Sequence, residues 1–153
     1  MRVPADTVAE AGVVGSLVLS GAHTGLLAGL VTESDFRDPR YGRMFAALVD
    51  YEAPPDSPLP ADPGQWMAWT LPRQAAAVTA LGAAHSDPAM DAVVVQWCVD
   101  RGSYVAGRVV AMAERVVDAR RRREAMAMLA EAYNALGEGA DLSDAAGLLS
   151  SMA

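Results

Sequence analysis

The chain has 153 residues, a formal net charge of -7 and 52% hydrophobic residues. This length fits one compact domain, or a small domain with an appendage, and the alanine-rich composition favours packed helices over a sheet. The negative charge argues against a general nucleic-acid coat, because non-specific affinity for nucleic acids comes mainly from cations that neutralise phosphates.

Cysteine content and hydropathy indicate the compartment. A single cysteine, Cys98, excludes an internal disulfide framework and fits a reducing environment. The N-terminal residues lack the apolar core of a signal peptide, and no run approaches the roughly 20 apolar residues of a membrane span. We therefore expect a soluble cytoplasmic protein with no membrane partner.

Helix starts are well marked in the first half of the chain. Thr7 and Glu10 have the spacing of a capping box, which predicts a first helix that begins with Thr7 as its N-cap and continues toward Gly21. Residues 25–31 form a short apolar segment, which we interpret as a helix of about two turns. The proline-rich residues 51–64 predict an exposed loop.

Three Asp-Pro pairs predict three further helices, because aspartate is a good N-cap and proline suits the first helical position. The pairs are Asp38-Pro39, Asp62-Pro63 and Asp87-Pro88. We expect the second of these helices to break at Pro72. The first and third are followed by apolar stripes that we expect to face the core: Tyr41, Met44, Phe45 and Leu48, then Met90, Val93, Val94 and Trp97.

A long helix is predicted from Tyr104 to about Leu136, with an apolar seam that steps by threes and fours. A turn at 137–141 and a returning helix would complete a helical hairpin. The predicted fold is therefore all-α, with a globular head of about five or six short helices in residues 1–102 and a hairpin for dimerisation or assembly in residues 103–153. The residues that we expect to mediate self-association are Val105, Val109, Met112, Val116, Met126, Tyr133 and Leu148.

The sequence offers no catalytic motif. A P-loop needs a lysine that reaches the phosphates, and this chain contains no lysine. His23 and His85 have no partner at metal-ligand spacing, and Cys98 is better interpreted as a core thiol than as a nucleophile. We therefore expect no enzymatic activity, no cofactor and no metal site.

Arginine is concentrated near the centre of the long helix. Arg120, Arg121, Arg122 and Arg123 are consecutive and spread over about 300° of a helix at 100° per residue, so they cannot all face one surface. They either form a solvated collar that pairs with acids such as Glu124 and Asp118, or they contact a partner or a phosphate. With Arg115, they are the candidate partner-binding residues.

Four segments, in this order, resemble the N-terminal domain of DnaB-type replicative helicases. Glu10, Val14, Gly15 and Leu17 match the family pattern E-x-x-V-L-G-x-L-L, and Asp35, Phe36, Pro39, Phe45 and Ala46 match D-F-Y-x-P-x-H-x-x-I-F-x-A. The segment LPADPGQWMAWTL and a late Tyr104 that leads into an arginine-bearing hairpin follow. The chain departs from the pattern at Arg37, where the family has an aromatic residue, and at Tyr41, where it usually has histidine.

The resemblance implies a non-enzymatic module that forms a homodimer or higher oligomer and binds a DnaB-type helicase or primase during DNA replication. In the family this domain is followed by a RecA-like motor, whereas the resemblance here covers nearly the whole chain and stops where the motor would begin. Two alternatives remain. The chain is part of a helicase whose motor lies on another chain, or it is an unrelated helical regulator that contacts DNA weakly through the arginine run.

Overall fold

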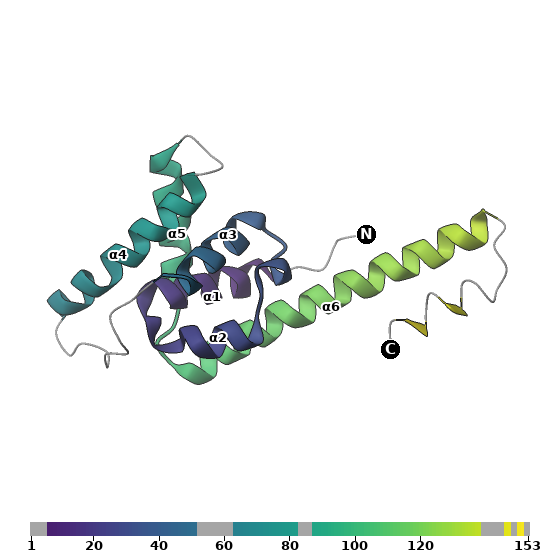
Figure 1. Ribbon diagram of the computed structural model, residues 1–153, viewed down its shortest axis with the longest axis horizontal. Helices are drawn as coiled ribbons and strands as arrows, with labels where there is room; N and C mark the ends of the chain where they lie inside the picture. Colours follow the sequence, from purple (N-terminus) through teal and green to yellow (C-terminus); the bar gives the residue numbers. More distant parts are fainter. Residues whose placement is uncertain (1–5, 52–62, 83–86, 139–145, 148–149, 152–153) are drawn as a thin grey trace. The chain divides into compact units, whose positions relative to one another are not determined.

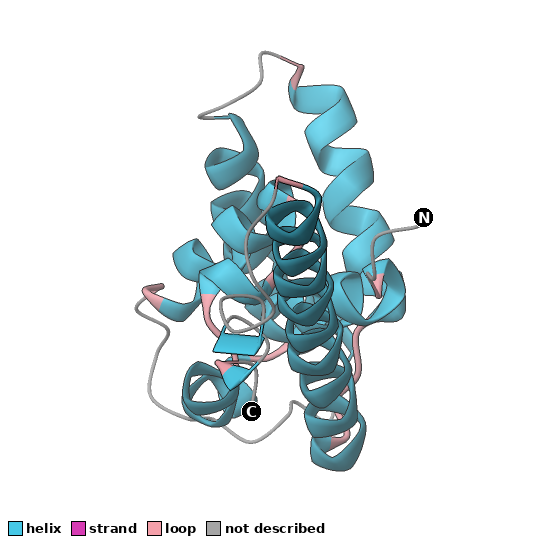
Figure 2. Cartoon of the chain, turned by 90° about the vertical axis from the view of Figure 1, so that its right-hand side faces the viewer, coloured by secondary structure: helices cyan, strands magenta, loops and turns pink. Residues whose placement is uncertain are grey.

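The computed structural model describes residues 6–51, 63–82, 87–138, 146–147 and 150–151. Within these ranges the regular structure is helical, as Figure 2 shows, and the predicted all-α fold is confirmed. The helices are α1 (Thr7–Leu19), α2 (Thr24–Leu30), α3 (Pro39–Val49), α4 (Pro63–Gly82), α5 (Pro88–Arg101) and α6 (Ala106–Gly137), with short 3-10 helices η1 (Gly21–His23) and η2 (Glu33–Asp35).

The described residues belong to two compact units. One unit, here called the head, comprises Asp6–Val117, and the other contains the described residues from Asp118 onward. The head therefore includes α1 to α5 and the first turns of α6, so it extends beyond residue 102, where the sequence placed its end. The predicted returning helix of the hairpin falls largely outside the described residues.

The first helix does not begin with the predicted capping box. Asp6 is the N-cap of α1, and its Oδ1 accepts a hydrogen bond from the backbone N–H of Ala9 at 3.0 Å. Glu10 does not reach back toward Thr7. Instead its side chain is buried and accepts hydrogen bonds from the backbone N–H groups of Arg37 and Asp38, so a residue distant in sequence replaced the local partner.

The Asp-Pro pairs mark the helix starts as predicted, since α3, α4 and α5 begin at Pro39, Pro63 and Pro88. The predicted break at Pro72 is wrong, because α4 continues through it to Gly82. A proline removes one backbone hydrogen bond and crowds the preceding turn. Beyond it, Ala77 and Leu81 are buried in the core of the head, and this packing holds the second half of α4 helical.

Helix α1 lies in the middle of the head and packs against α3, α4 and α5 (Figure 1). Ten consecutive residues of α1, from Ala9 to Val18, are buried, as expected for a helix surrounded by others. The apolar stripe of α3 faces this core as predicted, and the rings of Phe36 and Phe45 stack in a tilted arrangement with centroids 5.1 Å apart. The thiol of Cys98 is also buried in this core.

The contact between α1 and α5 is a backbone contact. A Cβ atom added to Gly102 would lie 2.6 Å from the carbonyl carbon of Gly15, and one added to Gly15 would collide with the backbone of Cys98. Only glycine fits where two backbones approach so closely. The backbone N–H of Ser103 also donates a 2.9 Å hydrogen bond to Ser16 Oγ, which fixes the end of α5 on α1.

The predicted core face of α5 is wrong for three of its four residues. Met90, Val93 and Trp97 are 57%, 62% and 48% exposed. Val94 packs against the core as predicted, and Val95 and Cys98 are buried there. The face that meets α1 must be narrow because the backbones are so close. Large side chains such as Met90 and Trp97 therefore point to the surface. The buried stripe lies about one residue further along the helix than the sequence predicted.

Candidate functional site

Three features of the described residues bear on function: the junction of α1 with α3, the exposed face of α5, and α6. At the junction, the carboxylate of Glu10 holds the two backbone N–H groups that precede Pro39. Asp35 is also buried, and its Oδ2 accepts a hydrogen bond from the backbone N–H of Thr32 at 2.7 Å, which closes η2.

A second carboxylate at this junction is that of Asp38, the N-cap of α3. Burial by itself would raise the pKa of Asp38, but side-chain and backbone hydrogen bonds from Arg40 outweigh it and hold the pKa below 3.8. The Arg40 Nη2–Asp38 Oδ2 distance is 2.7 Å. The hydrogen bonds of Glu10 and the ion pair of Asp38 thus hold the start of α3 against α1.

Cys98 is a core thiol in the structure. Burial raises its pKa to about 12, against the smaller opposite effect of the nearby Arg101. A thiol with such a pKa is protonated at neutral pH and is a poor nucleophile. Among the described residues no group of three or more His, Cys, Asp or Glu side chains could hold a metal ion.

The exposed face of α5 was missed in the sequence, which assigned Met90, Val93 and Trp97 to the core. These side chains share a face of the helix because they lie three and four residues apart. The guanidinium of Arg101 lies over the Trp97 ring. The face is therefore an apolar surface that ends in a cation.

The predicted self-association residues do not share one environment. Val109 and Val116 are 0% and 1% exposed in the core of the head, and Met112 packs against that core. Val105 is exposed. A charged residue introduced at Val109 or Val116 should therefore destabilise the head itself, so association through α6 has to be tested at other positions.

The rest of the predicted seam lies in the second unit. Met126 is half-buried and Tyr133 is 78% exposed. Leu129 and Leu136, which the sequence had not singled out, are exposed on the same part of α6. Leu148 lies outside the described residues.

The arginine run is partly engaged within its own helix. Arg120 Nε lies 2.9 Å from Glu124 Oε1 and Arg122 Nη2 lies 3.0 Å from Asp118 Oδ2, both as pairs four residues apart. These are the solvated pairs of the simpler interpretation, and exposed pairs of this kind each contribute about 0.3 to 0.5 kcal/mol. Arg115 belongs to the head instead, where its Nη2 lies 2.7 Å from Asp6 Oδ2.

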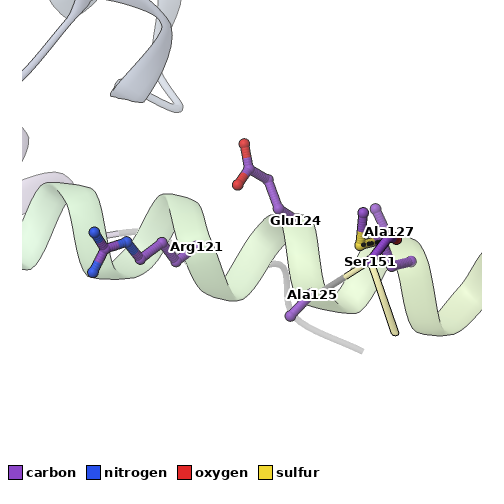
Figure 3. A pocket seen from close by; sticks show the side chains of 6 residues that line it. Arg121, Glu124, Ala125, Ala127 and Ser151 are labelled. Atoms are coloured by element: carbon purple, nitrogen blue, oxygen red, sulfur yellow. Dashed lines mark hydrogen bonds between the residues drawn. The ribbon is translucent and has the colours of Figure 1, made fainter. Parts of the chain in front are cut away.

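A shallow pocket of about 650 Å³ lies beside the run in the second unit (Figure 3). Its lining includes one cation and one anion, Arg121 and Glu124, with small side chains and Met128. The hydroxyl of Ser151 donates a long hydrogen bond of 3.8 Å to the sulfur of Met128. The described lining residues carry one positive and one negative charge and so no excess of positive charge, and this pocket therefore does not support phosphate binding by the run.

None of the helices in the described ranges combines the length and hydropathy needed to cross a membrane. Comparison of the chain with protein-family models, with curated proteins and with solved structures gives no match.

Proposed function

We propose that this chain is a non-enzymatic interaction module of the DnaB N-terminal type, which self-associates through α6 and binds a replicative helicase or primase. The proposal joins the sequence resemblance to two surfaces that are apolar and exposed, on α5 and on the distal part of α6. An exposed apolar stripe is unfavourable in water and is typical of a surface that a partner covers.

The observation that carries the proposal is the apolar stripe of distal α6. Met126, Leu129, Tyr133 and Leu136 recur at intervals of three and four, and three of them are more than 40% exposed. Residues at these intervals lie on one side of a helix and form the seam of a coiled coil. We expect the partner of this seam to be the same helix of a second copy of the chain.

Self-association is tested with a double variant, Leu129→Gln and Tyr133→Gln, compared with the wild type by light scattering. The variant should remain folded, because both side chains are exposed, and should lose the dimer or larger species. The matched control is Glu131→Gln with Asn134→Gln, two polar residues exposed on the same turns. A wild-type monomer at tens of micromolar would overturn this part of the proposal.

Partner binding is tested by surface-based assays against the host's DnaB-type helicase and against the helicase-binding domain of its primase. The expected result is saturable binding to at least one of them, without ATP hydrolysis by the chain itself. Binding to neither protein, or equal binding to unrelated acidic proteins, would contradict the proposal. Retention on single-stranded DNA alone would favour the DNA-binding regulator instead.

The arginine run sets the expected salt dependence. Changing Arg120 to Arg123 to glutamine should slow association with an acidic partner surface and reduce its dependence on salt, because exposed charges affect encounter more than stability. Arg37→Gln, an exposed arginine elsewhere in the head, is the control. If both variants behave alike, the run has no specific part in recognition.

A further inference from the structure

The head has an open surface pocket of about 300 Å³, called the cavity below, and its described lining residues include three arginines and no acidic residue. The lining residues are Arg101, Gly102, Ser103, Arg108, Ala111, Met112 and Arg115. All of them lie within Asp6–Val117, so the cavity belongs to one compact unit. In a chain with a formal net charge of -7, three arginines that line one pocket are a local concentration of positive charge.

The turn that connects α5 to α6 places the three arginines around one pocket. Arg101 ends α5, whereas Arg108 and Arg115 lie on α6 seven residues apart, which is about two helical turns and so nearly the same side of the helix. The turn itself is fixed, since the backbone N–H of Val105 donates to Ser103 Oγ at 3.0 Å and that of Ser103 donates to Ser16 Oγ. The fold therefore sets the backbone positions from which the three arginine side chains extend.

Two of the three guanidinium groups are already held in place. Arg101 Nη1 donates to the carbonyl oxygen of Trp97 at 2.9 Å. Arg115 donates to Asp6 Oδ2 through both Nε and Nη2 at 2.7 Å, and the other oxygen of Asp6 caps α1. Side chains that are fixed before binding lose less conformational entropy when a ligand arrives.

Arg108 differs from the other two. Its side chain is exposed, and among the described residues it makes no hydrogen bond or ion pair. Its charge is not needed by any described part of the fold. A ligand in the cavity would supply the anionic partner.

We infer that this cavity binds the terminal phosphate group of a small ligand such as a nucleotide. A guanidinium offers a planar fork of donors that matches phosphate oxygens. A terminal phosphate presents three oxygens to different forks at once, whereas a carboxylate presents two in one plane. Asp6 offsets one of the three cations, which leaves a charge suited to a phosphate dianion, and Ala111 and Met112 provide apolar lining for the rest of the ligand.

This inference does not rest on the helicase and primase contacts proposed above, although Arg101 belongs both to this lining and to the end of the exposed α5 face. The test therefore varies Arg108, which lies outside that face. The probes are inorganic pyrophosphate and a nucleoside diphosphate, titrated into the full chain by calorimetry at two salt concentrations. Both should bind saturably. Arg108→Gln should weaken binding about tenfold or more, as expected for a lost charge-assisted hydrogen bond, and should leave the thermal melting temperature unchanged.

Two further variants separate the site from general electrostatics. Arg108→Lys, which keeps the charge and loses the fork, should bind with intermediate affinity. Arg121→Gln, an exposed arginine on the same helix outside the cavity, should bind as the wild type does. Equal losses in Arg108→Gln and Arg121→Gln would show non-specific attraction and overturn the inference.

The source of the phosphate is tested with a single-stranded oligonucleotide that lacks terminal phosphates and with an acidic peptide. Neither should compete with pyrophosphate. If the oligonucleotide or the peptide binds and pyrophosphate does not, the terminal-phosphate site is excluded. Absence of saturable binding by both phosphate probes also excludes it.

Discussion

Helices α3 and α5 start alike, with an aspartate N-cap and a proline at the first helical position, and both carry apolar residues at helical spacing. In α3 that stripe is the core face, and Tyr41 and Met44 are buried. In α5 three of the four corresponding residues, Met90, Val93 and Trp97, are at the surface. The two helices have the same capping residues and similar apolar spacing, but they turn different sides toward the core.

The difference comes from the neighbour against which each helix packs. Helix α3 is joined to α1 through Glu10 and through large side chains, so large residues fill the space between the two helices. Helix α5 approaches α1 at Gly15, where the backbones nearly touch and only small side chains fit. Hydrophobic spacing predicts that a helix has an apolar face, and the width of the gap decides which face is buried.

The largest expected effect is at the stripe of α3. Phe45→Ala removes a buried ring that packs on Phe36, and should lower the free energy of unfolding by about 3 to 5 kcal/mol. Val93→Thr at the exposed stripe of α5 should change it by less than about 0.5 kcal/mol. Urea denaturation of both variants at one protein concentration measures the contrast.

A comparable loss of unfolding free energy in Phe45→Ala and Val93→Thr would contradict the conclusion that only the α3 stripe faces the core. If Val93→Thr destabilises the chain only at high protein concentration, the α5 face is covered by a second copy, because oligomer stability depends on concentration.

The next effect concerns the close contact itself. Gly15→Ala places a methyl group against the backbone of Cys98, which cannot move aside as a flexible side chain could, and should cost about 1 to 3 kcal/mol. The control is Gly107→Ala in α6, where a new Cβ has no neighbour within 4 Å. That variant should be unchanged or stabilised by up to about 1 kcal/mol in thermal unfolding. Equal behaviour would place the α1 and α5 backbones farther apart than described.

The shared helix start gives a smaller effect. Asp38→Ala and Asp87→Ala each remove a side chain that accepts backbone N–H groups at the first turn, and each should cost about 1 kcal/mol. Asp38→Asn and Asp87→Asn retain an acceptor oxygen and should lose only part of this. Similar losses of unfolding free energy for the Asp38 and Asp87 variants, measured by chemical denaturation, would show that the two helices are capped alike although they bury different faces.

The smallest effect is pH-dependent and separates Asp38 from a simple cap. Its pKa is lower in the folded protein than the ordinary value of 3.8, so ionised Asp38 stabilises the fold above that value and the contribution is lost as pH falls through the folded pKa. Asp38→Asn should therefore be less stable than the wild type near neutral pH and equal to it in strong acid. Thermal unfolding measured from neutral pH downward tests this, and a constant difference at all pH values would contradict it.

Much of the fold could be predicted because the relevant interactions are local. A capping oxygen and a proline act within the first turn of a helix, so the three Asp-Pro starts were correct. The two errors at α1 and α4 came from outside the turn. Asp6 and not Thr7 caps α1, and Glu10 bonds the backbone N–H of Arg37, 27 residues away, in place of the backbone of Thr7. Pro72 is accommodated because Ala77 and Leu81 beyond it are held in the core.

The candidate sites were less predictable, since they depend on which surfaces the fold leaves uncovered. The seam of α6 was visible as a pattern, but no spacing could tell that Val109 and Val116 serve the head while Tyr133 is exposed. Arg115 was singled out for its charge alone. Its place beside Arg101 and Arg108 follows from the turn that joins α5 to α6.

The sequence alone determined that this protein is helical, where most of its helices begin and which helices have an apolar side, because those properties are governed by energies between residues a few positions apart. The tertiary structure decided which side of α5 faces α1, which half of the α6 seam lies in the head, and how three arginines come to line one cavity. Each of these depends on the distance between segments that are far apart in the chain, and that distance is fixed only when glycines and side chains of different sizes have packed together.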